Sequence, residues 1–266
     1  MNLKLLIPSY RNRYRFIQTK LKQYNSDKKW EKALNLGCGE GDYDPMIARY
    51  TEQMIACDIN EQDIAFASQS NKTTPNLSYQ VEDALNLSFK DNSFDLITSM
   101  EVIEHVGKPY RMMEEIHRVL KPDGLLLMTY PSLDFPFTYD PINRIMSFFG
   151  DKHISQGAYA FGHDYLISPR KFRSKAKELG FEIIEEQNSS GYLIGLLEMY
   201  WTGWAQQLFK ANAANINEKE TGKITIRPDQ KAPALVAITD AIIWIDKILF
   251  SRLPNSVGKA VVLRKK

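Results

Sequence analysis

The sequence predicts an α/β fold in which helices cover both faces of a mainly parallel sheet. Short apolar segments alternate with helical stretches from Lys32 onward, which is the pattern of consecutive strand–helix units. The strand-like segment Ala33–Leu36 also runs directly into a glycine-rich turn and then a helix. A chain of 266 residues is long enough to bury one substantial core of this kind.

Each expected element follows from the local pattern. The expected strands are Ala33–Leu36, Met54–Cys57, Leu77–Val81, Phe94–Ser99, Leu125–Tyr130, Phe181–Glu186 and Ala260–Leu263. Helices are expected at residues 10–25, 43–51, 61–70, 109–120 and 169–179. The sequence Lys121-Pro122-Asp123-Gly124 predicts a helix end, a turn and the start of the fifth strand. Right-handed crossovers place the C-terminal ends of the parallel strands at one edge, so we expect the ligand site there.

The chain divides into four segments: a basic helix in residues 1–30, the strand–helix core in 31–190, an insertion in 191–258 and the last core strand in 259–266. About 70 residues separate the last two strands, which is too long for a simple connection. Two amphipathic helices are expected in the insertion, at Tyr192–Phe209 and Ala232–Leu253. In the second helix, Ile238, Ala241, Ile242, Ile245, Ile248 and Leu249 form the apolar face, and Asp240, Asp246 and Lys247 occupy the remaining surface.

Composition and charge exclude some classes of protein. A hydrophobic content of 44% and a charged content of 25% are ordinary for a globular protein, and a net charge of +2 argues against a dedicated nucleic-acid binder. Cys38 and Cys57 form no metal cluster and are expected to be reduced core thiols. We find no secretory signal and no run of about 18 uncharged apolar residues, so a cytoplasmic protein is expected.

The strongest local signal is the sequence LNLGCGEG at residues 34–41. Glycines there allow positive φ and close approach of a ligand. A dinucleotide site requires a third glycine where this chain has Asp42, and Glu40 and Asp44 stand beside it. Three carboxylates at this helix start would repel a pyrophosphate but tolerate a cationic sulfonium amino acid.

Two further acidic positions follow the next two strands. Asp58 comes about 20 residues after the glycines, where a carboxylate can accept hydrogen bonds from both ribose hydroxyls. Asp83 follows the third strand and can accept from an adenine amine, while Ala84 leaves room for the ring. Each aspartate alone is also typical of a turn or a helix cap, but the three positions together favour a ligand site.

With these features in place, the chain resembles the class I S-adenosylmethionine-dependent methyltransferases of the small-molecule, methyltransferase-11-like type. The resemblance covers about residues 30–190 and depends on LNLGCGEG, Asp58, VEDA, FDLITSMEVIEHV and HRVLKPDGLLLMTYP. It implies a Rossmann-like seven-stranded sheet with helices on both faces, a last strand antiparallel beside the fifth, and S-adenosylmethionine as cofactor.

The resemblance also implies roles for individual residues. Gly37, Cys38 and Gly39 should contact the methionine and ribose portions, Asp58 the ribose, Ile59 one adenine face, and Asp83 and Ala84 the adenine edge, with Ser99 or Met100 beneath the sulfonium. The family often has an aspartate where this chain has Asn35, so recognition of the amino group is expected to be weaker or shared with Glu40.

A possible catalytic group follows the fourth strand. If that segment is helical, Glu101, Glu104 and His105 share one face, and His105 could act as general base for an acceptor hydroxyl. The same trio resembles the E-x-x-E-H metal pattern of some O-methyltransferases, including those of quinone biosynthesis, in which His163 would supply a further ligand to a divalent ion. A packing role without metal remains the alternative.

The acceptor is expected to be small and lipophilic or aromatic, with oxygen the favoured accepting atom. Aromatic residues after the fifth strand support this, namely Phe135, Phe137, Tyr139, Phe148 and Phe149, as do Tyr200, Trp201 and Trp204 of the insertion. The insertion is interpreted as a helical cap, a homodimer contact, or a lid resting on a membrane surface with help from Arg11, Arg13 and Arg15.

Two other functions stay open at this point. One is a non-catalytic module that binds the cofactor for regulation, and the other is a nicotinamide-dependent oxidoreductase, which Asp42 and the VEDA segment disfavour. A nucleic-acid methyltransferase lacks support because no N-P-P-Y-like motif follows the fourth strand.

Overall fold

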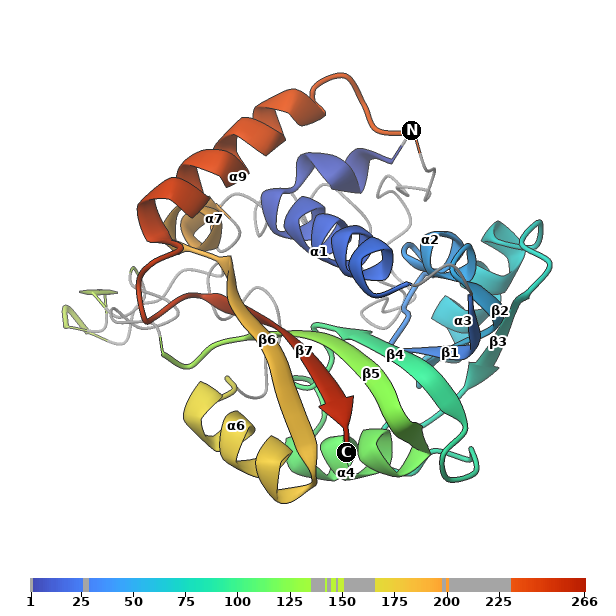
Figure 1. Cartoon of the computed structure of the whole chain (residues 1–266). Coiled ribbons are helices and arrows are strands. Elements are labelled where there is room, and N and C mark those ends of the chain that lie inside the picture. The colour runs from blue at the N-terminus through green and yellow to red at the C-terminus, as the bar shows by residue number, and fades with distance from the viewer. Residues whose placement is uncertain are drawn as a thin grey trace.

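The computed structural model describes residues 2–25, 29–134, 142, 145–146, 148–150, 166–197, 200 and 231–266. Its strands form one sheet of seven in the order β3-β2-β1-β4-β5-β7-β6 (Figure 1). Their bounds are β1 Trp30–Leu36, β2 Thr51–Asp58, β3 Leu77–Val81, β4 Phe94–Met100, β5 Leu120–Pro131, β6 Phe181–Ser190 and β7 Gly258–Lys265. The predicted seven-stranded fold is confirmed.

Strands β1 to β6 run in one direction, and β7 alone reverses it. β1 pairs in parallel with β2 and β4, with Leu34 opposite both Ile55 and Ile97. β7 lies antiparallel between β5 and β6, which confirms the topology that the resemblance implied. The C-terminal ends of β1 to β5 therefore share one edge, and the turns that follow them can surround a single ligand.

Helices cover the sheet on both faces. The bounds of the helices are η1 Leu3–Leu6, α1 Pro8–Tyr24, α2 Asp44–Ala48, α3 Glu61–Ser70, α4 Pro109–Val119, α6 Pro169–Glu178, α7 Tyr192–Leu196 and α9 Val236–Phe250. Buried residues of α4 and α6 join one apolar core, whereas those of α1, α2 and α3 join a second core on the opposite face (Figure 1). The N-terminal basic helix is thus part of the core packing, since Ile17 and Leu21 are fully buried.

Several element boundaries differ from the prediction by a few residues, and contacts or backbone geometry account for two of them. α2 ends at Ala48 rather than near residue 51, because the Tyr50 carbonyl accepts the Trp30 amide and the chain enters β2 at Thr51. β5 already begins at Leu120, and the Lys121–Gly124 segment forms an irregularity within it, with Asp123 in the left-handed region at φ 62°.

The insertion contributes α7 and α9; in Figure 1, α9 lies above α1 and α7 lies to its left. Of the predicted helix Tyr192–Phe209, the structure describes only residues 192–197 and 200, so Trp201 and Trp204 lie outside the described residues. Among the described helices, none combines the length and apolar character that a membrane crossing requires.

Candidate functional site

The glycine-rich turn after β1 is conformationally special at three positions. Gly37, Gly39 and Gly41 all have positive φ, at 76°, 50° and 79°. A Cβ on Gly37 would lie 2.3 Å from a methyl group of Val102, so the segment after β4 packs directly on the turn. A Cβ on Gly39 would meet nothing within 4 Å. The turn is therefore closed on the Gly37 side and open at Gly39, as a ligand cradle requires.

Asp58 lies beside this turn, at the C-terminal end of β2. One carboxylate oxygen accepts the Gly39 amide at 2.9 Å and the other accepts the Asn60 amide at 3.1 Å. Ile59 next to it is 69% exposed. Asp58, the predicted ribose acceptor, and Ile59, the predicted cover of the adenine face, are thus neighbours at the open side of the turn. By accepting the Asn60 amide, Asp58 also stabilises the local turn, which was the other role considered for it.

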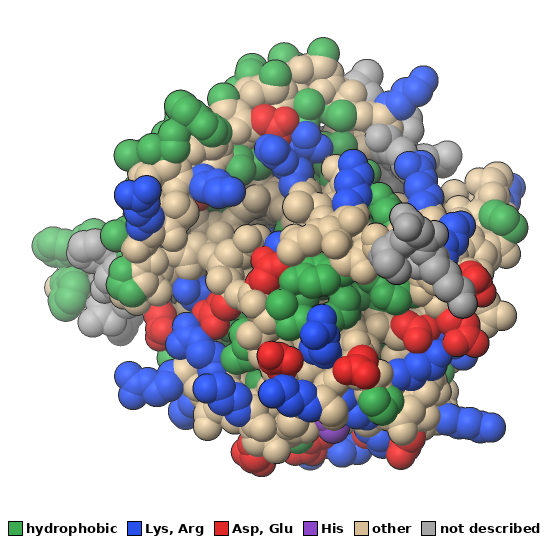
Figure 2. Space-filling view, viewed as in Figure 1, with side chains coloured by type: hydrophobic (Ala, Val, Ile, Leu, Met, Phe, Trp, Pro, Cys, Tyr) green, Lys and Arg blue, Asp and Glu red, His purple; other side chains and the backbone are tan. Residues whose placement is uncertain are grey.

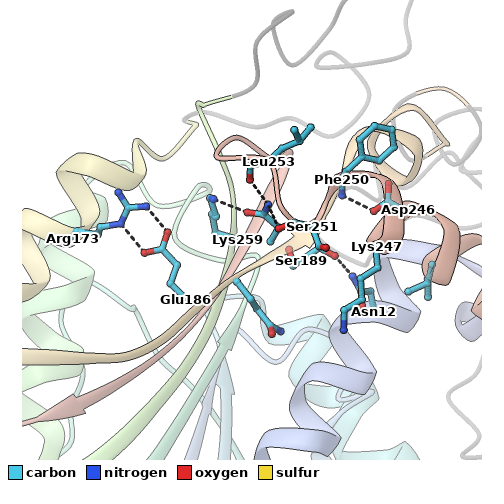
Figure 3. Close-up of a pocket in the computed structure, with 14 residues that line it drawn as sticks. Asn12, Arg173, Glu186, Ser189, Asp246, Lys247, Phe250, Ser251, Leu253 and Lys259 are labelled. Atoms are coloured by element: carbon cyan, nitrogen blue, oxygen red, sulfur yellow. Dashed lines mark hydrogen bonds and ion pairs between the residues drawn. The ribbon is translucent and has the colours of Figure 1, made fainter.

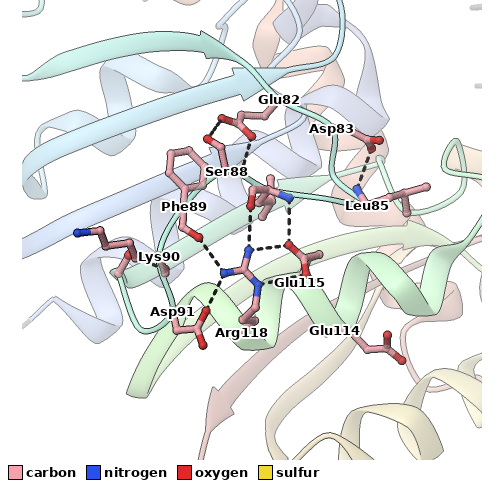
Figure 4. A network of polar contacts seen from close by, with 12 residues as sticks. Glu82, Asp83, Leu85, Ser88, Phe89, Lys90, Asp91, Glu114, Glu115 and Arg118 are labelled. Carbon is pink, nitrogen blue, oxygen red and sulfur yellow. Dashed lines mark hydrogen bonds and ion pairs between the residues drawn. The ribbon is translucent and has the colours of Figure 1, made fainter.

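The loop after β3 carries Asp83 and Ala84. Asp83 is exposed and accepts the Leu85 amide at 2.8 Å, while Ala84 is buried. Glu82 is buried and accepts both the amide and the hydroxyl of Ser88, which folds the loop back on itself (Figure 4). Asp83 therefore stays at the solvent side of a loop whose shape is fixed.

Two residues of α4, Glu115 and Arg118, hold the same loop from below (Figure 4). Arg118 donates to the carbonyls of Leu87 and Phe89, both at 2.8 Å, and pairs with Glu115 at 2.7 Å. Glu115 in turn accepts the Leu87 amide at 3.0 Å, and its contact with Arg118 holds the pKa of this carboxyl below its usual range. Sequence reasoning missed this support, although two charges three residues apart on a helix were a visible signal.

Asn35 is placed differently from the expectation. Its side chain is almost fully buried, donating to Asp44 at 2.6 Å and accepting from the Thr98 hydroxyl at 2.8 Å. Asp44 also accepts the Tyr79 hydroxyl at 2.8 Å and is fully buried. Burial raises the pKa of Asp44 to about 7 despite these two hydrogen bonds. The acidic group below the turn is therefore Asp44, held by Asn35.

The three carboxylates at the start of the helix after the glycine turn are not free charges. Lys4 of η1 pairs with Glu40 at 2.9 Å and with Asp42 at 2.6 Å, and Asp44 is buried. Glu40 is thus paired with Lys4. Its expected share in recognising the amino group of the cofactor stays a prediction. Lys4 of the N-terminal segment offsets much of the negative charge of Glu40 and Asp42. The residues near the turn gave no sign of this distant partner.

Ser99 and Met100 lie at the end of β4. Both are buried, and Met100 belongs to the core on the α1 face. The Ser99 hydroxyl has no hydrogen-bond partner among the described residues, although it is completely buried. A buried hydroxyl without a partner at a strand end is a position where a ligand atom can supply one.

Residues 101–105 form bends and turns rather than a helix. The expectation that Glu101, Glu104 and His105 share one helix face therefore does not hold. Glu101 has φ 55°, which is rare for a residue with a side chain, and lies 3.7 Å from Arg13 of α1. Glu104 is completely buried and lies 3.8 Å from Nε2 of the half-exposed His105. His163 lies outside the described residues, within which no group of three or more possible metal ligands occurs.

Both cysteines are buried and free, and burial raises the pKa of the Cys38 and Cys57 thiols. They are core thiols, as predicted.

A cavity of about 440 Å³ lies at the far side of the sheet, between the end of β6, α9 and α1 (Figure 3). Its lining is polar: Arg173 pairs with Glu186 at 2.7 Å, and Lys259 donates to Asn188 at 2.7 Å. Asn12 of α1 donates to the Ser189 carbonyl across it. None of the residues around the glycine turn lines this cavity, so it is not the cofactor edge described above.

Comparison with known proteins agrees with the geometry. Residues 34–128 match the family described as "Methyltransferase domain". The chain is 33% identical over 96 residues to a ubiquinone biosynthesis O-methyltransferase of Parvibaculum lavamentivorans, covering 36% of this chain and 38% of that relative. It is 26% identical over 191 residues to a ubiquinone/menaquinone biosynthesis C-methyltransferase of Haemophilus ducreyi, covering 65% and 73%.

The fold extends further than the sequence similarity. The structure of a proposed sarcosine dimethylglycine methyltransferase from Galdieria sulphuraria has a TM-score of 0.61 at 17% identity, covering 97% of this chain and 86% of that one. Residues 34–128 therefore match a methyltransferase domain, and nearly the whole chain shares the fold of that solved structure. The chain spans 38% and 44% of the length of two of the curated relatives that it matches, so the relatives' acceptors are not transferred to it directly.

Proposed function

We propose that this protein transfers a methyl group from S-adenosylmethionine to a small lipophilic or aromatic acceptor, with oxygen as the favoured accepting atom. The observation that carries the proposal is the open glycine turn: Gly39 has empty space beside it, and Asp58 and the exposed Ile59 border that space. A nucleoside fits such an edge, because a carboxylate suits ribose hydroxyls and an exposed aliphatic side chain suits the adenine face.

The residues present fit the cofactor. Gly37, Cys38 and Gly39 would hold the methionine and ribose portions, Asp58 the ribose, Ile59 the adenine face, and Asp83 with Ala84 the adenine edge. Ser99 or Met100 would lie under the sulfonium, and the buried, unpartnered hydroxyl of Ser99 favours a polar ligand atom there. Asn35 would act indirectly, by holding Asp44. When bound, the sulfonium supplies an electrophilic methyl group, and the protein supplies alignment and exclusion of water.

His105 is the proposed general base for an acceptor hydroxyl. Its ring is half exposed, so a substrate can reach it, and the buried Glu104 carboxylate lies 3.8 Å from Nε2, which favours the protonated imidazole after proton transfer. Glu101 begins the same segment and has a left-handed backbone conformation. A catalytic or metal-ligating role of His163, and a divalent ion held by Glu101, Glu104, His105 and His163, remain predictions.

The lipophilic acceptor is supported by relatives that carry quinone-biosynthesis names and by the apolar surface of the insertion. Phe148 and Phe149 are 75% and 80% exposed, so these two aromatic residues lie at the surface rather than in an enclosed pocket.

Calorimetric titration separates the enzyme classes. We expect saturable binding of S-adenosylmethionine and no binding of NADH. Asp58→Asn keeps the side-chain volume but loses one hydrogen-bond acceptor, and it should raise the Kd for S-adenosylmethionine about tenfold or more. Asp123→Asn, at an exposed carboxylate far from the turn, is the matched control. Tight binding of NADH instead would refute the proposal.

Activity is tested with methyl-labelled cofactor and a lipid and metabolite extract. We expect label in an apolar product, and His105→Ala should lower turnover about 100-fold or more with little change in cofactor affinity. A chelator tests the metal: unchanged turnover in the wild type would remove the metal hypothesis. Cofactor binding without any labelled product would favour the non-catalytic binding module.

A further inference from the structure

The amphipathic character of α9 is inverted. A helix on the surface of a globular protein normally buries its apolar face and exposes its polar one. In α9 the buried residues are Thr239, Ile243 and Asp246, two of them polar. The sequence pattern identified the apolar face correctly, and Asp240 and Asp246 lie off that face as expected, but both are bound to the protein and the apolar face is the exposed one.

The inward polar residues are bound to the protein. The Thr239 hydroxyl donates to the Leu6 carbonyl at 3.1 Å. Asp240 forms a bidentate pair with Arg11 at 2.9 and 3.0 Å. Asp246 accepts the amides of Gly191, Leu193 and Ile194 at the start of α7. These contacts fix the rotation of α9 about its axis, because each buried polar group would lose its partner if the helix turned over.

The outer surface is consequently apolar along the whole helix. Its large exposed side chains are Leu235, Ile238, Trp244, Ile245, Ile248 and Leu249, all between 42% and 65% exposed. With Ala241 and Ile242 between them, they lie along one side of the helix, visible as the hydrophobic side chains over α9 at the top left of Figure 2. We call these six residues the α9 stripe. A row of large aliphatic and Trp side chains along one exposed helix face is typical of a helix that lies in a membrane interface.

Charge indicates what the α9 stripe contacts. Within residues 231–257 the carboxylates are Asp240 and Asp246, and both are turned toward the protein. The cations Lys231, Lys247 and Arg252 are exposed around and beyond the helix. A stripe of aliphatic and Trp side chains with a cationic border matches the boundary of an anionic lipid bilayer.

A second copy of the chain fits this surface less well. A helix of 15 residues is about 22 Å long, and with a width of about 11 Å its outer face covers about 250 Å². A stable protein interface needs about 800 Å² from each partner. A lipid surface needs no matching partner surface, so the stripe suffices there.

We propose that α9 lies on anionic membrane surfaces, with the α9 stripe inserted among the acyl chains near the headgroups. This partner deepens the proposed function, because a methyltransferase for a lipophilic acceptor then meets its substrate in the layer where that substrate dissolves. The membrane contact itself does not depend on methyl transfer.

The test is co-sedimentation of the full chain with phosphatidylcholine vesicles, with and without phosphatidylglycerol. We expect the wild type to pellet with the anionic vesicles at low salt. Ile245→Gln combined with Ile248→Gln should lower the vesicle partition coefficient about tenfold or more, since each change removes one inserted side chain. Both residues are exposed, so melting temperature and cofactor affinity should stay at the wild-type values.

Charge reversal supplies the matched control. Lys247→Glu with Arg252→Glu should reduce pelleting with anionic vesicles, whereas Lys171→Glu with Lys177→Glu makes the same charge change on α6 and should not. The proposal is overturned if the wild type does not pellet, or if the Ile245/Ile248 variant pellets equally. It is also overturned if sedimentation velocity shows a dimer that this variant dissociates while vesicles bind neither protein. Failure to bind S-adenosylmethionine would instead refute the proposed function and leave the vesicle result standing.

Discussion

Asp44 provides a quantitative test of the electrostatics below the glycine turn. Its carboxyl is fully buried, and its pKa rises from 3.8 to about 7 because burial outweighs the hydrogen bonds from Tyr79 and Asn35. The folded protein therefore holds a proton on Asp44 at pH values where the unfolded chain has lost it. It follows that the free energy of unfolding falls as the pH rises from about 4 to about 7, and is level above that.

The magnitude follows from the shift. Each pKa unit corresponds to about 1.4 kcal/mol, so three units amount to about 4 kcal/mol, of which about 3 kcal/mol falls between pH 5 and pH 8. Asp44→Asn keeps the size and removes the titration. We expect the difference in unfolding free energy, wild type minus variant, to fall by about 3 kcal/mol across this range.

Urea denaturation at pH 5, 6, 7 and 8, monitored by circular dichroism, measures the effect. Asp123→Asn controls for loss of a carboxylate, because Asp123 is exposed and Asn also adopts its left-handed backbone conformation. Parallel pH profiles for the wild type and Asp44→Asn would show that Asp44 is ionised at low pH in the folded state, and the reasoning would be refuted. If the cofactor's ammonium group binds above Asp44, its affinity should also rise with pH through pH 7 in the wild type but not in the variant.

Three other changes test the site. Gly37→Ala should destabilise the protein by about 3 kcal/mol in urea denaturation, because φ is 76° and the new Cβ meets Val102, and a loss below 1 kcal/mol would contradict the close packing. Gly39→Ala is its matched partner: it should cost only about 1 kcal/mol of stability, but it should weaken S-adenosylmethionine binding in calorimetry, since its Cβ enters the open space. Arg118→Met removes support from the loop after β3. It should therefore increase hydrogen exchange at the Leu87 amide and raise the Kd for the cofactor several-fold. Arg170→Met, on the exposed side of α6, is the control and should change neither.

The sheet could be predicted from the sequence because its strands are short apolar runs bounded by turns. Every predicted strand lies within an observed one, and the glycine turn, Asp58 and Ile59 adjoin as expected. The local pattern also fixed which residues of α9 share an apolar face. It could not fix which way that face points, since the direction depends on partners more than 50 residues distant, such as Gly191 for Asp246.

Similar long-range contacts explain the other differences at the site. The charge of Glu40 and Asp42 looked uncompensated because Lys4 is more than 30 residues away in sequence. Asn35 looked like a weakened ligand because its partner Asp44 lies nine residues on, in a helix whose burial the sequence did not reveal. Lys4 was outside the window that a local pattern covers, whereas Asp44 was in view but its burial and its contact with Asn35 were not.

The N-terminal segment joins these two regions of the molecule. Lys4 binds the glycine turn, Tyr10 stacks on Tyr43 with ring centroids 5.3 Å apart, and Arg11 binds Asp240 of α9. The basic residues that seemed suited to lipid headgroups are thus used inside the protein: Arg11 and Arg15 pair with Asp240, and Arg13 faces Glu101. Because residues 4–15 bind both the glycine turn and α9, a membrane contact through α9 fixes the orientation of the cofactor edge relative to the bilayer. The cations that attract an anionic surface must then be those around α9, which is why charge reversal at Lys247 and Arg252, rather than in α1, is the informative experiment.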